Sequence, residues 1–242
     1  WTPTDNILAY FSVTTGYRSG GFSLGEIDAR LSDPVTGELK PTSYDQEEVI
    51  AFEIGYKGLH LDGTLQLNMS LYTYDYDNYQ DLVNFFSSNT GQSLNLVTNA
   101  DSARNTGFEL EGLWLATDNL TVGGNFSITK TEYTSDVFVR IDDDPAHPAS
   151  LFSGSEYDAL FVTNADGSQL KKIPEEKATL WATYDWQTRY GGFTFNGTYS
   201  YTGEYYDQGV ERDLDLIPDR FRVDLSATWR DVNKIWSVRL FV

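Results

Sequence analysis

The chain has no cysteine, one methionine and only two histidines among its 242 residues. A chain without cysteine has neither a disulfide framework nor a thiolate metal site. Basic residues are also scarce, because 17 Lys and Arg stand against 36 Asp and Glu, for a formal net charge of -19. Nucleic-acid binding needs clustered basic side chains, so this balance argues against a nucleic-acid partner. Acidity of this kind most often serves as a solvated surface.

The sequence patterns of common catalytic sites are missing as well. No phosphate-binding loop, dinucleotide-binding glycine pattern or nucleophile elbow occurs. His60 and His147 have no catalytic constellation around them, and a surface role is the simpler reading of both. Glu109 and Glu111 stand about 7 Å apart on one face of a strand, a spacing that could suit paired carboxylates. A hydrated wall of a barrel lumen is the preferred interpretation, because carboxylates are normal there. We expect no enzymatic activity and no cofactor.

No run of about 18 apolar residues exists, so the sequence contains no candidate membrane-spanning helix. Aromatic residues are abundant at 15%, and they fall into alternating patterns. Residues 103–133 form two legs around a turn at 117–119, and each leg is longer than the roughly ten residues that a tilted strand needs to cross a bilayer. The pattern predicts a transmembrane β-hairpin. Four apolar residues of this hairpin are expected to face lipid and three polar ones the lumen: Phe108, Leu110, Phe126 and Ile128, against Glu109, Glu111 and Asn125.

Short and long connections between such segments take turns along the chain. The short ones fall at residues 59–63, 117–119, 188–191 and 231–234, and the long ones at 19–45, 84–92, 136–174 and 206–219. Outer-membrane barrels have short periplasmic turns and long extracellular loops, so we expect loops 136–174 and 206–219 at the cell surface. Aromatic residues near strand ends could supply the interface girdles of such a barrel: Tyr17, Tyr56, Trp114, Trp186, Tyr190 and Trp229.

The loop alternation also predicts the number of strands. Parity makes residues 94–114 a single long strand, and the whole chain then has about nine strands. A soluble β-sandwich would show the same alternation, although long, even strands and asymmetric loops favour the barrel. Nine strands leave two open edges that cannot face lipid. We therefore expect the chain to be an incomplete barrel that cannot close when it folds alone.

Several segments resemble those of one family, the TonB-dependent outer-membrane receptors. Residues 9–22 read AYFSVTTGYRSGGF and resemble the family's "YxSxSxGYRSGGF" strand. Residues 53–57, EIGYK, resemble its "ExGxK" segment, and residues 75–80, DYDNYQ, its "YxDYQ" stretch. Residues 99–111 resemble "NA…xGxELE". No single motif is specific, but their order and spacing extend over essentially the whole chain.

The resemblance implies an all-β fold, an antiparallel transmembrane β-barrel of twenty-two strands with an N-terminal plug inside it. Residues 1–242 would then be a C-terminal part of the barrel, about strands thirteen to twenty-one, without the plug domain and the first barrel half. The implied function is import of a scarce nutrient across the outer membrane of a Gram-negative bacterium. A ferric siderophore is the commonest cargo of the family, and a carbohydrate, cobalamin or another metal chelate remains open. A passive porin or surface adhesion barrel, and a soluble all-β binding module, are the alternatives.

The implied partners are the lipid bilayer, lipopolysaccharide, a small-molecule ligand, and the TonB energy-coupling protein acting through the plug. Aromatic residues near the long loops are the candidates for a ligand-binding mouth, because small-ligand sites combine aromatic and polar groups: Tyr76, Tyr79, Phe85, Phe86, Tyr157, Phe161, Tyr205 and Tyr206. Carboxylate clusters can also bind calcium, and the weaker candidates for such a site are Asp142, Asp143 and Asp144. Their spacing departs from the known calcium loop, so a solvated cap over the mouth is the preferred interpretation.

Overall fold

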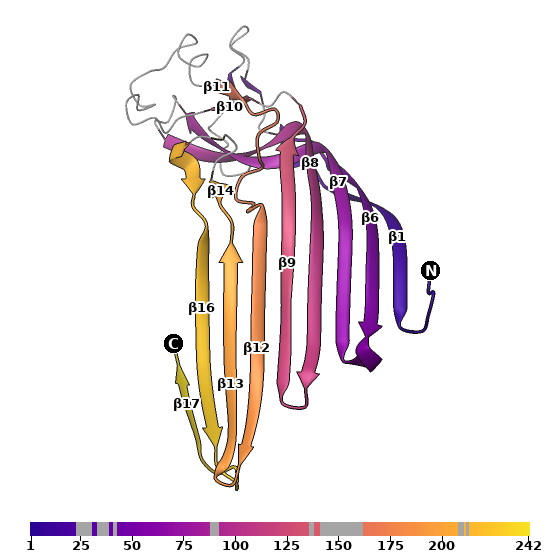
Figure 1. Cartoon of the computed structure of the whole chain (residues 1–242). Coiled ribbons are helices and arrows are strands. Elements are labelled where there is room, and N and C mark those ends of the chain that lie inside the picture. The colour runs from indigo at the N-terminus through magenta and orange to yellow at the C-terminus, as the bar shows by residue number, and fades with distance from the viewer. Residues whose placement is uncertain are drawn as a thin grey trace.

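The computed structural model describes residues 1–22, 31–32, 39–40, 43–87, 92–135, 138–140, 162–207, 211 and 213–242. Its main feature is one antiparallel sheet of nine strands in which each strand pairs with the strands before and after it (Figure 1). The predicted strand count and the all-β class are therefore confirmed. The nine strands, in sheet order, are β1 (Ile7–Arg18), β6 (Glu47–His60), β7 (Leu65–Ser87), β8 (Gln92–Thr117), β9 (Leu120–Tyr133), β12 (Glu176–Thr188), β13 (Gly191–Thr202), β16 (Arg220–Arg230) and β17 (Ser237–Phe241).

Small two-stranded ladders and single 3₁₀ turns make up the rest of the described structure. The ladders pair β2 (Gly21–Phe22) with β5 (Ser43–Tyr44), β3 (Leu31–Ser32) with β4 (Leu39–Lys40), β10 (Phe138–Arg140) with β11 (Val162–Asn164), and β14 (Tyr205–Tyr206) with β15 (Leu216–Ile217). All of them belong to the long connections. The 3₁₀ turns are η2 (Leu61–Gly63) and η4 (Asp213–Asp215). None of the helices in the described residues is long and apolar enough to span a membrane.

The strand register separates the side chains into two faces. Phe11 lies opposite Ile54, which lies opposite Leu71, and the same row continues through Phe108 to Ile128. The neighbouring row on the other face pairs Ser70 with Glu109 and Glu109 with Ser127. Because successive side chains alternate across a strand, one face is apolar and the other polar over the whole sheet. The predicted segregation of Phe108, Leu110, Phe126 and Ile128 from Glu109, Glu111 and Asn125 is confirmed.

The apolar face is open. Phe11 is 67% exposed, Ile54 58% and Leu71 55%, and no second sheet packs on them among the residues described. A soluble sandwich would cover this face with another sheet, and soluble monomers rarely leave so large an apolar surface in water. The arrangement favours the membrane barrel over the soluble β-sandwich.

The predicted long loop at 84–92 is wrong in its extent. β7 and β8 stay paired as far as Ser87 and Gln92, so only residues 88–91 lie outside the two strands. Asn78 adopts a positive φ of 53°, a conformation that asparagine accepts more readily than most residues. Beyond it, the outer part of the hairpin leaves the direction of the wall and crosses over the long-loop end of the sheet (Figure 1). Strand pairing therefore continues through a bent hairpin over most of the residues that were expected to form a loop.

Aromatic rings on the polar face lie over glycines of the adjacent strand. Tyr10 is the register partner of Gly55, and Trp181 that of Gly123. A Cβ placed on Gly55 would come within 2.2 Å of the Tyr10 ring, and one on Gly123 within 2.4 Å of the Trp181 ring. Only glycine leaves room for these rings, so each pair fixes how far an aromatic side chain stands out from the wall.

The sheet is not closed, as expected. Among the described residues, β1 has a partner strand on one side only. β17 pairs with β16 over Ser226–Arg230, and Leu225 and Val242 add a reciprocal pair of backbone hydrogen bonds at 3.0 Å each. Backbone groups of Arg220 to Asp224 therefore face an open edge on that side.

Replacing Phe126 with arginine tests which face meets lipid. Phe126 lies near the middle of β9 on the apolar face, and an arginine in lipid near the bilayer midplane costs about 2–4 kcal/mol. Arginine at the adjacent Asn125, the matched control, should cost little, since Asn125 is on the polar face opposite Glu111. The measurement is the free energy of folding into lipid bilayers, and equal costs at the two positions would contradict the assignment of faces.

Candidate functional site

The described residues bury one hydrophobic cluster, and it lies at the long-loop end of the sheet. Its members come from β8, β9 and the segment that leads into β12: Ala100, Ala103, Tyr133, Ala165 and Leu170. Tyr76, Tyr79 and Ile173 pack around them. We call residues 165–173 the strap. The cluster packs the strap against β8 and β9.

Three tyrosines hold the centre of this cluster. The Tyr76 and Tyr79 ring centroids are 5.6 Å apart, and those of Tyr79 and Tyr133 are 6.3 Å apart, both edge to face. Burial, followed by the charge of Asp81, raises the pKa of Tyr79 to about 12. Burial, the charge of Asp81 and a hydrogen bond to it raise the pKa of Tyr133 well above its ordinary value. Both hydroxyls therefore stay protonated at neutral pH.

Asp81 joins the cluster to the strap. Its carboxylate accepts a hydrogen bond of 2.8 Å from the Tyr133 hydroxyl and forms an ion pair of 2.7 Å with Lys171 of the strap. It also accepts the backbone N–H of Leu82 at 2.8 Å, and the Lys171 ammonium donates to the Leu82 carbonyl. The Asp81 side chain is 14% exposed and that of Lys171 21%, so solvent screens this pair less than it screens a surface salt bridge.

The strap is also bound to β9 through its backbone. Gly167 donates to the carbonyl of Tyr133 at 2.9 Å, and Tyr133 donates to the carbonyl of Ser168 at 3.0 Å. The N–H of Leu170 reaches the Thr131 hydroxyl at 3.2 Å. Asp81, Tyr133 and Lys171 were not among the residues expected from sequence. The "YxDYQ" stretch ends one residue before Asp81, and it was the only signal that could have drawn attention to this position.

The predicted mouth residues separate into three groups. Tyr76 and Tyr79 come together in the buried cluster. Tyr205 and Tyr206 form β14, where the Arg220 guanidinium lies 5.8 Å from the Tyr205 ring centroid, and the Tyr206 carbonyl accepts the N–H of Lys172 at 2.7 Å. Phe85 and Phe86 lie on β7 opposite Leu94 and Ser93, and their side chains are outside the described part of the structure. Ligand binding by any of these residues stays a prediction.

Two predicted aromatic residues and the three predicted calcium ligands fall outside the described residues: Tyr157 and Phe161, and Asp142, Asp143 and Asp144. Where the structure is described, no group of three His, Cys, Asp or Glu side chains is placed to hold a metal ion. The calcium site at Asp142 to Asp144 therefore stays a prediction.

A hollow of about 460 Å³ lies on the polar face over β1, β6, β7, β8 and β9. Glu53, Glu109 and Glu111 line it, together with a single cation, Lys57. The Tyr10 hydroxyl donates to Glu53, the Lys57 ammonium lies 5.8 Å from the Tyr10 ring centroid, and Asn68 donates to Glu111 at 3.1 Å. Glu109 and Glu111 thus belong to a hydrogen-bonded, acidic wall, which is the simpler of the two interpretations of their spacing.

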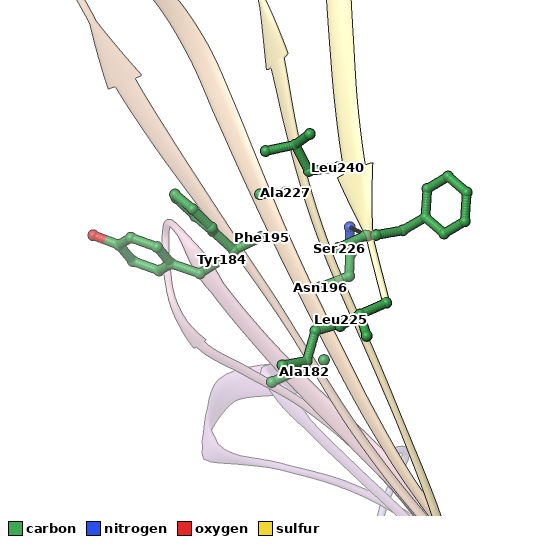
Figure 2. A pocket seen from close by; sticks show the side chains of 11 residues that line it. Ala182, Tyr184, Phe195, Asn196, Leu225, Ser226, Ala227 and Leu240 are labelled. Atoms are coloured by element: carbon green, nitrogen blue, oxygen red, sulfur yellow. Dashed lines mark hydrogen bonds between the residues drawn. The ribbon is translucent and has the colours of Figure 1, made fainter.

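A second hollow, of about 600 Å³, lies near the open edge between β12, β13, β16 and β17. Figure 2 shows Tyr184, Phe195 and Leu240 around it, with Asn196 and Ser226 as its polar side chains. No charged side chain lines it. It lies along the strands, away from the buried cluster, and follows from the partial cover that β17 gives to β16.

Comparison with known proteins places the chain in a family. The family model described as "TonB dependent receptor-like, beta-barrel" matches residues 1–242. Among solved structures, the ferric yersiniabactin uptake receptor FyuA from Yersinia pestis is similar over 100% of this chain at a TM-score of 0.69 and 18% identity. The siderophore receptor PiuA from Acinetobacter baumannii is similar over 99% of it at 0.65 and 22%. A copper transporter, OprC, is similar over 94% at 0.59 and 14%.

These likenesses show the shared fold. This chain spans 30% of the length of the first of these structures and 29% of the other two.

Replacing Tyr133 with phenylalanine should loosen the strap. The variant loses a hydrogen bond to a charged group, which typically contributes about 1.5–3 kcal/mol. Tyr79→Phe is the matched control, because the Tyr79 hydroxyl has no hydrogen-bond partner among the described residues. Amide hydrogen exchange of residues 165–173 should rise in the first variant and change little in the second. Equal exchange in both variants would show that the bond between Tyr133 and Asp81 does not hold the strap.

Proposed function

Because the chain belongs to the TonB dependent receptor-like β-barrel family, we propose that it is part of a receptor that imports a scarce nutrient, a ferric siderophore, across the outer membrane of a Gram-negative bacterium. The observation that carries this proposal is the match of the family model along the whole of a two-faced, nine-stranded sheet. Of the similar structures named above, one is a ferric yersiniabactin uptake receptor and another is a siderophore receptor.

The sheet is suited to act as part of a barrel wall. Its exposed apolar face would meet the lipid bilayer, with lipopolysaccharide around its outer end, and its polar face would line a hydrated lumen. The open edges, at β1 and at β17 with the uncovered part of β16, would pair with further strands of the same barrel, because unpaired N–H and C=O groups cost several kcal/mol each in lipid. By this proposal, residues 1–242 are about nine of twenty-two strands.

The acidic hollow on the polar face suits the segment that would fill the barrel. Three carboxylates, on Glu53, Glu109 and Glu111, outnumber the one cation there, Lys57. A plug packed against this wall would be favoured if it placed basic side chains opposite them. The energy-coupling protein TonB would act through that plug. No residue of the described wall is needed for covalent chemistry in such a mechanism.

The long-loop end would be the ligand entrance. Tyr205 and Tyr206 border the strap, and their rings combine apolar surface with hydroxyl groups, as small-ligand sites usually do. A ferric siderophore has both apolar and polar parts, so aromatic rings and loop hydrogen-bond donors could both contribute to its capture. A copper transporter among the similar structures makes a copper complex the alternative cargo.

Growth under iron starvation tests the cargo. A strain whose own siderophore receptors are deleted should regain growth on at least one ferric siderophore of a panel when it expresses the full-length protein. Uptake should stop when the proton-motive force is abolished, since active import needs energy from the inner membrane. Uptake that continues without that force would identify a passive porin. Uptake of a copper complex, with no growth on any ferric siderophore of the panel, would identify a copper importer.

Cysteine labelling tests the orientation. Leu214 is 70% exposed between β14 and β15, so Leu214→Cys should react with a membrane-impermeant thiol reagent on intact cells. Asp118→Cys, in the short turn between β8 and β9, is the control and should react only after the outer membrane is opened. The reverse pattern would mean that the short turns face the outside.

A further inference from the structure

Two adjacent residues of β7, Gln80 and Asp81, reach in different directions from one point of the mouth. They follow Asn78, the residue with the positive φ, at the start of the bent part of the hairpin. Successive side chains on a strand point to opposite sides. Gln80 reaches the connection at residues 19–45, and Asp81 reaches the strap.

Gln80 holds both ends of the first long connection. Its side-chain amide lies 3.3 Å from the Arg18 carbonyl and 3.1 Å from that of Ser19, where the connection starts. The same amide lies 3.0 Å from the carbonyl of Asp45, where the connection ends. Its backbone N–H donates to the Glu47 carboxylate at 2.6 Å. Gln80 is only 6% exposed, so these contacts are shielded from water.

Asn99, the register partner of Gln80, reinforces the same point. Its side-chain oxygen accepts the N–H of Asp45 at 2.6 Å, and its side-chain nitrogen donates to the carbonyl of Asp45 at 3.1 Å and to that of Asn78 at 2.7 Å. One amide side chain thus pairs with the backbone of Asp45 as a neighbouring strand would.

On the other side, Asp81 binds Lys171 and Tyr133. The strap is in turn hydrogen-bonded to the connection at 206–219. The N–H of Lys172 donates to the Tyr206 carbonyl at 2.7 Å, and that of Gln169 donates to the Glu211 carboxylate at 2.9 Å. Both acceptors belong to the connection at 206–219. A continuous path therefore runs from Asp45 to Tyr206: a hydrogen bond joins Asp45 to Gln80, an ion pair joins Asp81 to Lys171, and a hydrogen bond joins Lys172 to Tyr206. The peptide bonds Gln80–Asp81 and Lys171–Lys172 connect these steps.

We propose that Gln80 and Asp81 are positioning residues for the connections at 19–45, 136–174 and 206–219. They hold together the bases of these connections, meaning the residues next to the wall, and we call the three joined bases the collar. Because the two residues share a peptide unit, a displacement of one base moves the others. A ligand that binds to one connection would therefore change the opening equilibria of all three. The proposal concerns the loop bases themselves and holds whichever cargo the protein carries.

Hydrogen exchange of the full-length protein in membranes tests the collar. The variants are Gln80→Ala and Asp81→Asn, and the reporters are amides in residues 43–50 and in residues 203–207. Loss of bonds to a buried amide or carboxylate should raise local opening about tenfold. The collar requires each variant to accelerate exchange in both reporters, although Asp81 contacts neither and Gln80 contacts only the first.

Asp77→Asn is the matched control, because Asp77 lies on the same strand and its side chain makes no hydrogen bond or ion pair among the described residues. It should leave both reporters unchanged. If Asp81→Asn does not fold, Lys171→Met breaks the same ion pair from the strap and should give the same pattern. Acceleration limited to the nearer reporter would overturn the proposal, as would no acceleration. An equal rise in hydrogen exchange at residues 120–128 of the wall would also overturn it, since the substituted residue would then stabilise the whole sheet.

Discussion

The structure depends on one constraint, which is that a strand can satisfy its backbone N–H and C=O groups only through the strands beside it. In water this condition is loose, because solvent can replace a missing neighbour. In lipid it is strict, and it requires strands that are long and paired on both sides. β6 and β9 each have 14 residues, and the side chains follow from that regularity, with one apolar face and one polar face.

The same constraint explains how much of the fold could be predicted from sequence. Apolar and polar residues alternate regularly at residues 108–111 and 125–128, because one side of each strand belongs to the apolar face and the other side to the polar face. This regularity made the strands predictable. Parity of the short turns then gave β8 as one long strand. The bend at Asn78 escaped prediction, because a single residue in the left-handed region changes the direction of a hairpin without changing its polarity pattern.

The mouth was harder to predict for a different reason. Tyr76 and Tyr79 were selected for their rings, but they pack with Tyr133, whose position depends on a segment more than thirty residues further along the chain. Asp81 and Lys171 are 90 residues apart in sequence and 2.7 Å apart in space. Local patterns carry no information on such pairs. The residues that organise the mouth are therefore polar residues with no distinctive spacing, and only the three-dimensional structure brings them together.

The pairing of rings with glycines on the polar face has a consequence for the bore of the barrel. The radius of a barrel made of one layer of strands is set by strand number and tilt. The free space inside is smaller than this radius by the height of the side chains that point inward. Tyr10 over Gly55 and Trp181 over Gly123 lie where a Cβ would otherwise be, so two of the largest side chains take up little of that radius. A methyl group at either glycine would tip its ring toward the axis. In the barrel proposed above, the space left for a passing molecule would therefore depend on the positions of these glycines.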